Sequence, residues 1–205
     1  MKDTAQPLIS SPEGDLPSAV RWAHLLIHGR LRPGDWALDA TAGNGHDTLF
    51  LAQSVSPGGR VFAFDVQAAA LAQTRARLVA AGIDEHAVEL LNCGHETLAD
   101  VLPPDARGRV QVIMFNLGWL PGSDKSVITE TSRTLPAIRA ALEWLAPGGL
   151  MTVVVYPGHE GGADEALGVA GLAGGLSPRA FEVQHIRLVN RPACPPECWA
   201  FWKRH

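Results

Sequence analysis

One segment of the sequence combines polar side chains with glycines at the spacing of a ligand-binding turn. It covers residues 39–48, reads D-A-T-A-G-N-G-H-D-T, and directly follows a short apolar run at 36–38. Glycine lets the backbone turn sharply and approach a ligand closely, because it has no Cβ atom. Gly43 and Gly45 therefore predict a strand-end loop that holds a nucleotide-like cofactor.

The charge of Asp39 separates two kinds of cofactor. Thr48 stands where the dinucleotide fingerprint expects a third small residue. A carboxylate that ends the first strand and points into the crevice above the sheet would repel a pyrophosphate. It would accept hydrogen bonds from the ammonium group of S-adenosylmethionine. The segment therefore favours a methyltransferase over a dinucleotide-binding protein. We expect the Asp39 carboxylate to be open to the crevice.

The next two predicted strands also end in polar residues. Asp65 follows the apolar run 61–64, and a carboxylate at this place can accept both ribose hydroxyls of either cofactor. Gly94 and His95 follow the run 88–91 and are expected near the adenine. His95 has either an adenine-side or ribose-side role or is an ordinary surface loop histidine.

The fourth apolar run, 110–115, ends in a sequence suited to holding an amine, N-L-G-W-L-P-G-S-D-K. Amino-group methyltransferases place an Asn or Asp, two prolines and an aromatic residue here. The amide and a backbone carbonyl accept hydrogen bonds from the amine, while the ring stacks on its base. Asn116 and Trp119 match the first and last positions, with Leu117 and Gly118 replacing the prolines. The alternative is a turn capped by Asn116, with Trp119 covering the core.

The segment after the fifth apolar run, 150–155, is expected at the same edge of the sheet. It covers residues 156–162 and reads Y-P-G-H-E-G-G. Tyr156 and His159 could orient or deprotonate an amine, and the glycines permit a close approach. His159 as a plain loop residue is the alternative.

The hydrophobic pattern predicts the elements that position these segments. Helical stretches separate the apolar runs, at 47–53, 68–81 and 131–145, and A-P-G-G after the last one indicates a helix stop and turn. A helix over 16–29 leads into the first strand. This alternation indicates a parallel sheet with helices on both faces. Two β-prone runs, 181–189 and 198–203, are joined by a connection too short for a crossover helix, which predicts an antiparallel hairpin.

Composition bounds the class of protein. The 205 residues fit one domain over 15–205, after a flexible Pro- and Ser-rich leader over 1–14. The first residues lack the features of a signal peptide and no long apolar run exists, so we expect a cytoplasmic protein without membrane contact. An odd set of three cysteines favours free thiols, and no metal is expected at C-P-P-E-C. With a net charge of −4, any contact with nucleic acid requires a local basic patch or a small footprint.

Together these segments resemble a bacterial family long labelled rRNA methylases, whose characterised members are tRNA 5-(aminomethyl)-2-thiouridine methyltransferases. The resemblance covers about Leu16 to the C-terminus. The most specific blocks are G-N-G-H-D and N-L-G-W-L-P-G-S-D-K. The family usually carries Tyr and Gly where Trp119 and Ser123 stand here, and Trp still offers a face for stacking.

The resemblance implies an α/β, Rossmann-like class I methyltransferase with a seven-stranded, mostly parallel sheet and a C-terminal antiparallel hairpin. It implies S-adenosylmethionine as cofactor, a tRNA anticodon loop as substrate, and often a homodimer. Residues expected around the cofactor are Asp39, Ala40, Thr41, Gly43, Asn44, Gly45, His46, Asp47, Thr48, Asp65, Val66, Gln67, Gly94, His95 and Asn116. Residues expected to perform the chemistry are Asn116, Trp119, Asp124, Tyr156 and His159. Further substrate contacts are expected from Leu117, Gly118, Lys125, Gly161 and Gly162.

The implied reaction is a direct displacement, in which the uncharged amine of a wobble 5-aminomethyl-uridine attacks the sulfonium methyl group. Cys93 follows the third strand rather than the catalytic loop, so no thiolate attack on the uracil ring is expected. Candidates for a basic patch are Arg21, Arg30, Arg32, Lys125, Arg133, Arg139 and Arg191. The alternatives are methylation of rRNA or of a small-molecule amine, a cofactor-binding protein without chemistry, and a nicotinamide oxidoreductase.

Overall fold

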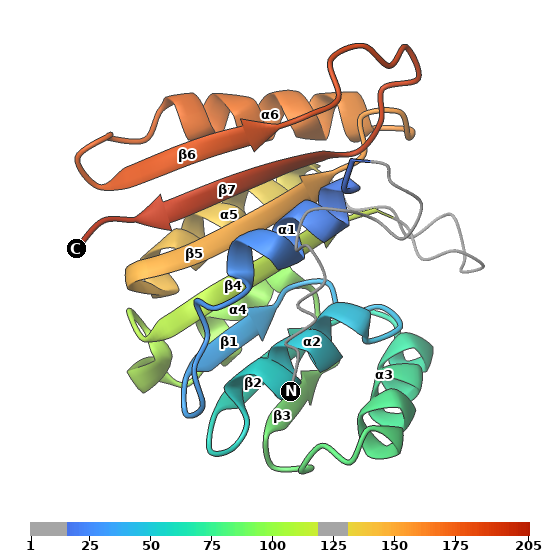
Figure 1. The fold of residues 1–205 in the computed structure, drawn as a ribbon, viewed down its shortest axis with the longest axis vertical. Coiled ribbons are helices and arrows are strands. Elements are labelled where there is room, and N and C mark those ends of the chain that lie inside the picture. Colours follow the sequence, from blue (N-terminus) through green and yellow to red (C-terminus); the bar gives the residue numbers. More distant parts are fainter. Residues whose placement is uncertain (1–15, 119–130) are drawn as a thin grey trace, which may run out of the picture.

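A central β-sheet lies between two layers of helices in the computed structural model, which describes residues 16–118 and 131–205 (Figure 1). Its strands are β1 (Trp36–Asp39), β2 (Arg60–Phe64), β3 (Val88–Leu91), β4 (Val110–Leu117), β5 (Leu145–Val155), β6 (Phe181–Ile186) and β7 (Glu197–Lys203). Their order across the sheet is β3-β2-β1-β4-β5-β7-β6. The first five are parallel, whereas β7 runs antiparallel to both β5 and β6. The predicted sheet and C-terminal hairpin are confirmed.

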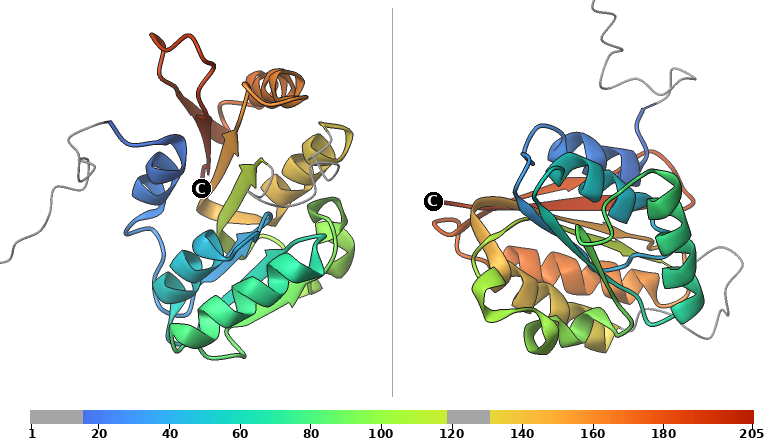
Figure 2. Two further views of the ribbon diagram at one scale, coloured as in Figure 1. Left: turned by 90° about the vertical axis from the view of Figure 1, so that its right-hand side faces the viewer. Right: turned by 90° about the horizontal axis from the view of Figure 1, so that it is seen from below.

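The helices form one layer on each face of the sheet (Figure 2). One face is covered by α1 (Ala19–Ile27), α2 (His46–Val55) and α3 (Ala68–Ala80). The other is covered by α4 (Leu98–Val101), α5 (Thr131–Trp144) and α6 (Gly162–Gly174), with short 3-10 turns at His95–Thr97 and Pro104–Ala106. Among the described helices, none has both the length and the apolar character needed to cross a bilayer.

Alternation along the strands decides which layer each side chain faces. On β4, Met114 packs with the α1 and α2 side of the core, whereas Phe115 packs with the α5 side. The same alternation assigns the next residue, Asn116, to the α1 and α2 side, and buried Leu117 to the α5 side. The polar residues that end β1, β4 and β5 therefore converge on one face of the sheet, at its carboxyl edge.

Several elements differ from the sequence-based expectation: the short helix α4 was not predicted, β6 ends at Ile186 rather than at 189, and α6 and β5 differ more strongly. Helix α6 was not predicted, because its sequence G-A-D-E-A-L-G-V-A-G-L-A-G is rich in glycine, which lowers helix propensity. Burial of Val169 and Leu172 against the sheet stabilises it nevertheless. A-P-G-G lies inside β5 rather than in a turn, because Leu145 already pairs with Val110 and the register shifts before Leu150 pairs with Val112.

Candidate active site

The glycine loop after β1 is held in place by two neighbouring elements. Gly43 and Gly45 have φ values of 51° and 79°, in the left-handed region that favours glycine. The backbone N–H of Gly43 donates to Oδ2 of Asp65 at 2.8 Å, and its carbonyl accepts from the Thr74 hydroxyl at 2.8 Å. A Cβ on Gly45 would lie 2.8 Å from Thr74. The loop therefore packs directly against α3 without room for a side chain.

Arg77 on α3 also fixes this loop, and sequence reasoning missed it together with Thr74. Its Nε donates to the carbonyl of Asn44 at 2.7 Å, and one terminal nitrogen lies 3.1 Å from Nε2 of His46. Because a guanidinium only donates, Nε2 of His46 is the acceptor in this contact. The exposed His46 side chain thus faces α3.

Asp39 lies beneath the loop rather than open to the crevice, so the expectation of an open carboxylate is wrong. Its exposed fraction is 0%. Oδ1 accepts from the backbone N–H of Thr41 at 3.1 Å, and Oδ2 accepts from the hydroxyl of Thr48 at 2.6 Å. Burial raises the pKa of Asp39 to about 7, with a further contribution from the charge of Asp47. The first turn of α2 covers this carboxylate, which ties the start of α2 to the end of β1.

Asp65, at the end of β2, is half-buried and faces the same loop. Its oxygens accept from the backbone N–H groups of Gly43 and Gln67, each at 2.8 Å. Each oxygen keeps a free lone pair after these contacts, so the carboxylate can still accept from a pair of hydroxyls. The adjacent Val66 side chain is 50% exposed, which leaves an apolar surface beside the carboxylate.

His95 is buried, so its alternative as a surface loop residue is wrong. Its exposed fraction is 8%, Nδ1 lies 3.3 Å from the carbonyl of Ala40, and its ring meets Phe115 edge to face. Burial lowers the pKa of His95, which favours the neutral ring. A Cβ on Gly94 would collide with the Glu96 carboxylate. His95 therefore supports the start of the loop after β1 through its contact with Ala40.

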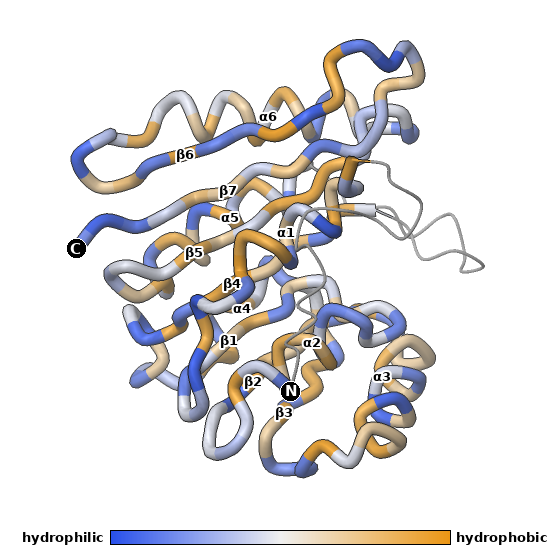
Figure 3. Tube along the Cα trace, in the orientation of Figure 1, coloured by the Kyte–Doolittle hydropathy of each residue, from blue (hydrophilic) through white to orange (hydrophobic). Residues whose placement is uncertain are grey.

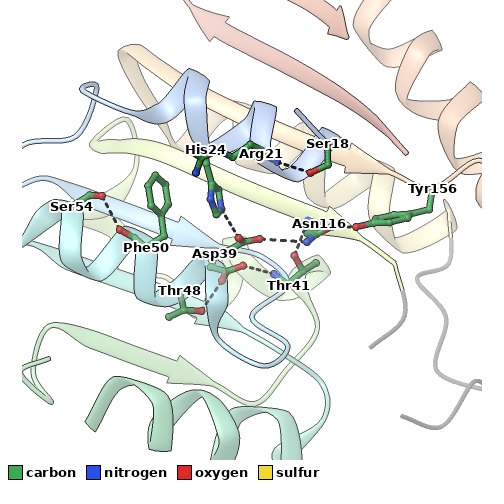
Figure 4. A network of polar contacts seen from close by, with 11 residues as sticks. Ser18, Arg21, His24, Asp39, Thr41, Thr48, Phe50, Ser54, Asn116 and Tyr156 are labelled. Atoms are coloured by element: carbon green, nitrogen blue, oxygen red, sulfur yellow. Dashed lines mark hydrogen bonds and ion pairs between the residues drawn. The ribbon is translucent and has the colours of Figure 1, made fainter. Parts of the chain in front are cut away.

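A chain of polar contacts joins four elements at the carboxyl edge (Figure 4). Nε2 of His24 on α1 lies 2.7 Å from Oδ1 of Asp47 on α2. Oδ2 of Asp47 accepts from Nδ2 of Asn116 at 3.4 Å, and Oδ1 of Asn116 accepts from the Tyr156 hydroxyl at 2.8 Å. The backbone N–H of Asn116 donates to the hydroxyl of Thr41 at 2.8 Å. Asn116 is thus fixed through both its backbone and its side chain.

The orientation of the Asn116 amide follows from the chemistry of its neighbours. A carboxylate only accepts, so the amide nitrogen faces Asp47 and the oxygen faces Tyr156. Burial and the negative charge of Asp47 raise the pKa of Tyr156. The phenol therefore stays protonated and donates, which supports the orienting role expected of Tyr156 rather than deprotonation of an amine.

His24 was not among the residues singled out from the sequence. It stacks on Phe50 at a centroid distance of 4.3 Å and an angle of 12°. It lies one turn before Ile27 on the face of α1 that packs on the sheet, and its side chain is 22% exposed. A polar residue within an apolar helix stripe is the signal that could have drawn attention to it.

The remaining residues that were expected to contact the substrate differ in their exposure and in their distance from Tyr156. Leu117 has an exposed fraction of 1% in the core, so a contact from its side chain is not supported. Gly118 is exposed beside the Tyr156 ring, and the His159 ring stacks on that ring at 5.1 Å. Gly161 is exposed and precedes α6, whereas Gly162 is buried, because it begins that helix against the Tyr156 carbonyl. Trp119, Asp124 and Lys125 lie outside the described residues.

The cysteines and possible metal ligands point to no further centre in the described part of the chain. Burial raises the pKa of the Cys198 thiol to about 12, so it stays protonated. Cys194 is exposed and Cys93 is half-buried, and all three are free thiols. No group of three or more His, Cys, Asp or Glu residues within 16–118 and 131–205 is arranged to hold a metal ion.

The fold and the site together define a class. An antiparallel last strand inserted beside β5, a glycine loop after β1, a carboxylate after β2 and a fixed Asn after β4 are the plan of Rossmann-like class I methyltransferases. A dinucleotide-binding Rossmann sheet instead has the parallel order 3-2-1-4-5-6.

Comparisons with known proteins narrow this class. The chain belongs to the family described as "Putative rRNA methylase", whose model matches residues 61–201. A chloroplastic protein of Arabidopsis thaliana named tRNA (mnm(5)s(2)U34)-methyltransferase is 38% identical over 184 residues, which cover 86% of this chain and 66% of that protein. The chain thus matches just under two thirds of the length of that relative.

Solved structures support the same assignment. A "putative rRNA-methylase" from Clostridium thermocellum has a TM-score of 0.86 and 35% identity over 92% of this chain and 99% of its own. A protein of Streptococcus mutans described as "a putative methyltransferase", solved in complex with S-adenosylhomocysteine (SAH), has a TM-score of 0.82 and 33% identity over the same shares. The family resemblance found from the sequence motifs is confirmed.

Proposed function

We propose that this chain is an S-adenosylmethionine-dependent N-methyltransferase that acts on the 5-aminomethyl group of the tRNA wobble uridine. The observation that carries the proposal is the Asn116 amide, held between Tyr156 and Asp47 at the end of β4. The name of the Arabidopsis relative, which states a tRNA wobble-uridine methyltransferase, supports the same substrate.

The described residues fit the cofactor. Asp65 keeps lone pairs for the ribose hydroxyls, and Gly43 itself carries no side chain that would block a close approach. Asp47 and Asp65 lie at this edge of the sheet, and their negative charge favours a cationic ligand and disfavours a pyrophosphate. When bound, S-adenosylmethionine supplies an electrophilic methyl group on a sulfonium ion.

The site also fits an amine substrate. Oδ1 of Asn116 uses one lone pair for the Tyr156 hydroxyl and keeps another to accept an N–H of the target amine. The Asp47 carboxylate, joined to the same amide, stabilises positive charge that develops on the nitrogen. The residues therefore contribute mainly orientation and electrostatic stabilisation.

Asn116→Ala tests the assignment of this site. We expect turnover to fall by about 100-fold, while SAH affinity measured by calorimetry stays close to that of the wild type. A variant with normal turnover would show that Asn116 does not position the substrate. Gln53→Ala is a matched control, because Gln53 is an exposed amide near the end of α2, away from the carboxyl edge of the sheet.

The substrate is tested with labelled cofactor and tRNA that lacks the modification. We expect label in the nucleoside 5-methylaminomethyl-uridine or its 2-thio form, identified by mass spectrometry. Label confined to rRNA or to a small amine would overturn the tRNA proposal. Tight binding of NAD without binding of SAH would overturn the methyltransferase proposal itself.

We further propose that the chain recognises the anticodon loop, acts as a homodimer and works in the cytoplasm. A loop substrate suits a chain with a net charge of −4, because a small footprint needs few phosphate contacts. An isolated anticodon stem-loop should then be methylated nearly as well as whole tRNA. Light scattering and a fluorescent fusion test the assembly and the location.

A further inference from the structure

We propose that the loop between β6 and β7, residues 187–196, is an RNA-binding arm that contacts phosphates next to the target nucleotide. We call this loop the hairpin arm. The inference rests on the proposed function, because it names the surface through which the same active site holds its RNA substrate.

The strand pairing places the hairpin arm beside the candidate active site. Glu197, the first residue of β7, pairs with Val155, which directly precedes Tyr156. Ile186, the last residue of β6, pairs with Cys198. The arm therefore projects from the carboxyl edge of the sheet, at the end where β4 and β5 finish (Figure 1).

The arm is also packed against the segment that carries Tyr156. A Cβ on Gly158 would lie 3.1 Å from the carbonyl oxygen of Cys194 and 3.2 Å from that of Ala193. The two backbones are thus in direct contact. The arm contains three prolines in R-L-V-N-R-P-A-C-P-P, which restrict its backbone, so less conformational freedom is lost when it binds a partner.

The charge of the arm is opposite to that of the whole chain. It holds Arg187 and Arg191 and no acidic residue, in a chain with a net charge of −4. Both arginines are exposed, and neither takes part in an ion pair among the residues that the structure describes. Between them Val189 is 81% exposed, which offers an apolar contact for a ribose or base. Along the loop between β6 and β7, Figure 3 shows both hydrophilic and hydrophobic segments. Unpaired arginines beside an apolar side chain are suited to a nucleic-acid strand.

The structure places four of the other arginines that were candidates for a basic patch. Arg30 and Arg32 lie between the end of α1 and the start of β1, so they occupy the opposite edge of the sheet. Arg133 pairs with Glu96 at 3.5 Å. Arg21, exposed near the start of α1, lies at the same edge as the arm. The candidate RNA surface is therefore the hairpin arm together with the start of α1.

The test compares two double variants by RNA binding. Arg187→Ala with Arg191→Ala removes the arm charges, and Arg30→Ala with Arg32→Ala removes two exposed arginines from the opposite edge as a matched control. Binding of a fluorescent anticodon stem-loop is measured by anisotropy at several salt concentrations. We expect the arm variant to bind about tenfold more weakly, with a salt slope lower by about 1 to 2. The control should bind like the wild type.

Further measurements distinguish a loss of positive charge from a loss of folding. They also distinguish a failure of this inference from a failure of the proposed function. Arg187→Lys with Arg191→Lys keeps the charge and should restore binding, which a loss of folding would not allow. Equal RNA affinity of the arm variant and the wild type would overturn the proposal that the hairpin arm binds RNA. An equal loss of RNA affinity in the control variant would overturn it as well. A wild-type chain that methylates no RNA would instead overturn the proposed function, whatever the variants do.

Discussion

Nε2 of His24 lies 2.7 Å from Oδ1 of Asp47, and this contact links the first helix of the described chain to the candidate active site. Asp47 in turn meets the amide of Asn116 on β4. His24 has no direct contact with the proposed amine acceptor, so we assign it as a positioning residue that acts through the Asp47 carboxylate.

Replacing His24 should therefore lower turnover more than substrate affinity. We expect His24→Ala to reduce kcat by about tenfold with little change in KM, because a misplaced carboxylate loosens the Asn116 amide. His24→Gln, which keeps a donor in that direction, should recover part of the loss. His86→Ala is the control, since His86 is highly exposed on the surface. Equal kcat values for the two alanine variants would contradict the positioning role.

Tyr156→Phe tests whether the phenol orients Asn116. Its hydroxyl donates to Oδ1 of Asn116 at 2.8 Å, and the loss of one such hydrogen bond corresponds to about tenfold in rate. Because burial raises the pKa of Tyr156 above its ordinary value of 10.0, the phenol does not ionise near neutral pH. The pH profile of kcat should thus keep its shape in the variant. A limb of the wild-type profile that disappears in Tyr156→Phe would identify the phenol as a base.

Asp39 should make the folded state less stable as the pH rises. Its pKa is about 7 in the folded protein against an ordinary 3.8, so the folded state holds the proton more tightly. The resulting stability is fully present below 3.8 and is lost as the pH rises through about 7. We expect Asp39→Asn to melt higher than the wild type at pH 8 by roughly 5 °C, with a smaller difference at pH 5. Scanning calorimetry at both values measures this, and an equal difference at both would refute the raised pKa.

Gly45→Ala should weaken both folding and cofactor binding. Gly45 has φ 79°, and a Cβ there would lie 2.8 Å from Thr74, so α3 would have to move. Gly58→Ala is a close control, because Gly58 has φ 82° with nothing within 4 Å. We expect both variants to lose about 1 to 2 kcal/mol of unfolding free energy from backbone strain, and only Gly45→Ala to lose more and to bind SAH weakly in calorimetry. Normal SAH binding by Gly45→Ala would show that the glycine loop after β1 is not part of the cofactor site.

Local patterns in the sequence were sufficient for most of the fold. Three apolar runs, each followed directly by a polar residue, identified three of the parallel strands. The polar residues are Asp39, Asp65 and Asn116. The short connection between β6 and β7 predicted the antiparallel hairpin. Helix α6 escaped this approach, because its stability comes from packing against the sheet rather than from helix propensity.

The sequence by itself determined the alternation of strands and helices, the glycine loop and the family, since these depend on neighbouring residues along the chain. Only the tertiary structure decided that Asp39 is buried, that Leu117 faces the core, and that His24 meets Asp47. It also placed the hairpin arm, which carries Arg191, at the carboxyl edge of the sheet and Arg30 at the opposite edge. The physical reason is that burial, hydrogen bonding and charge proximity depend on residues that are distant in the sequence and adjacent only after folding.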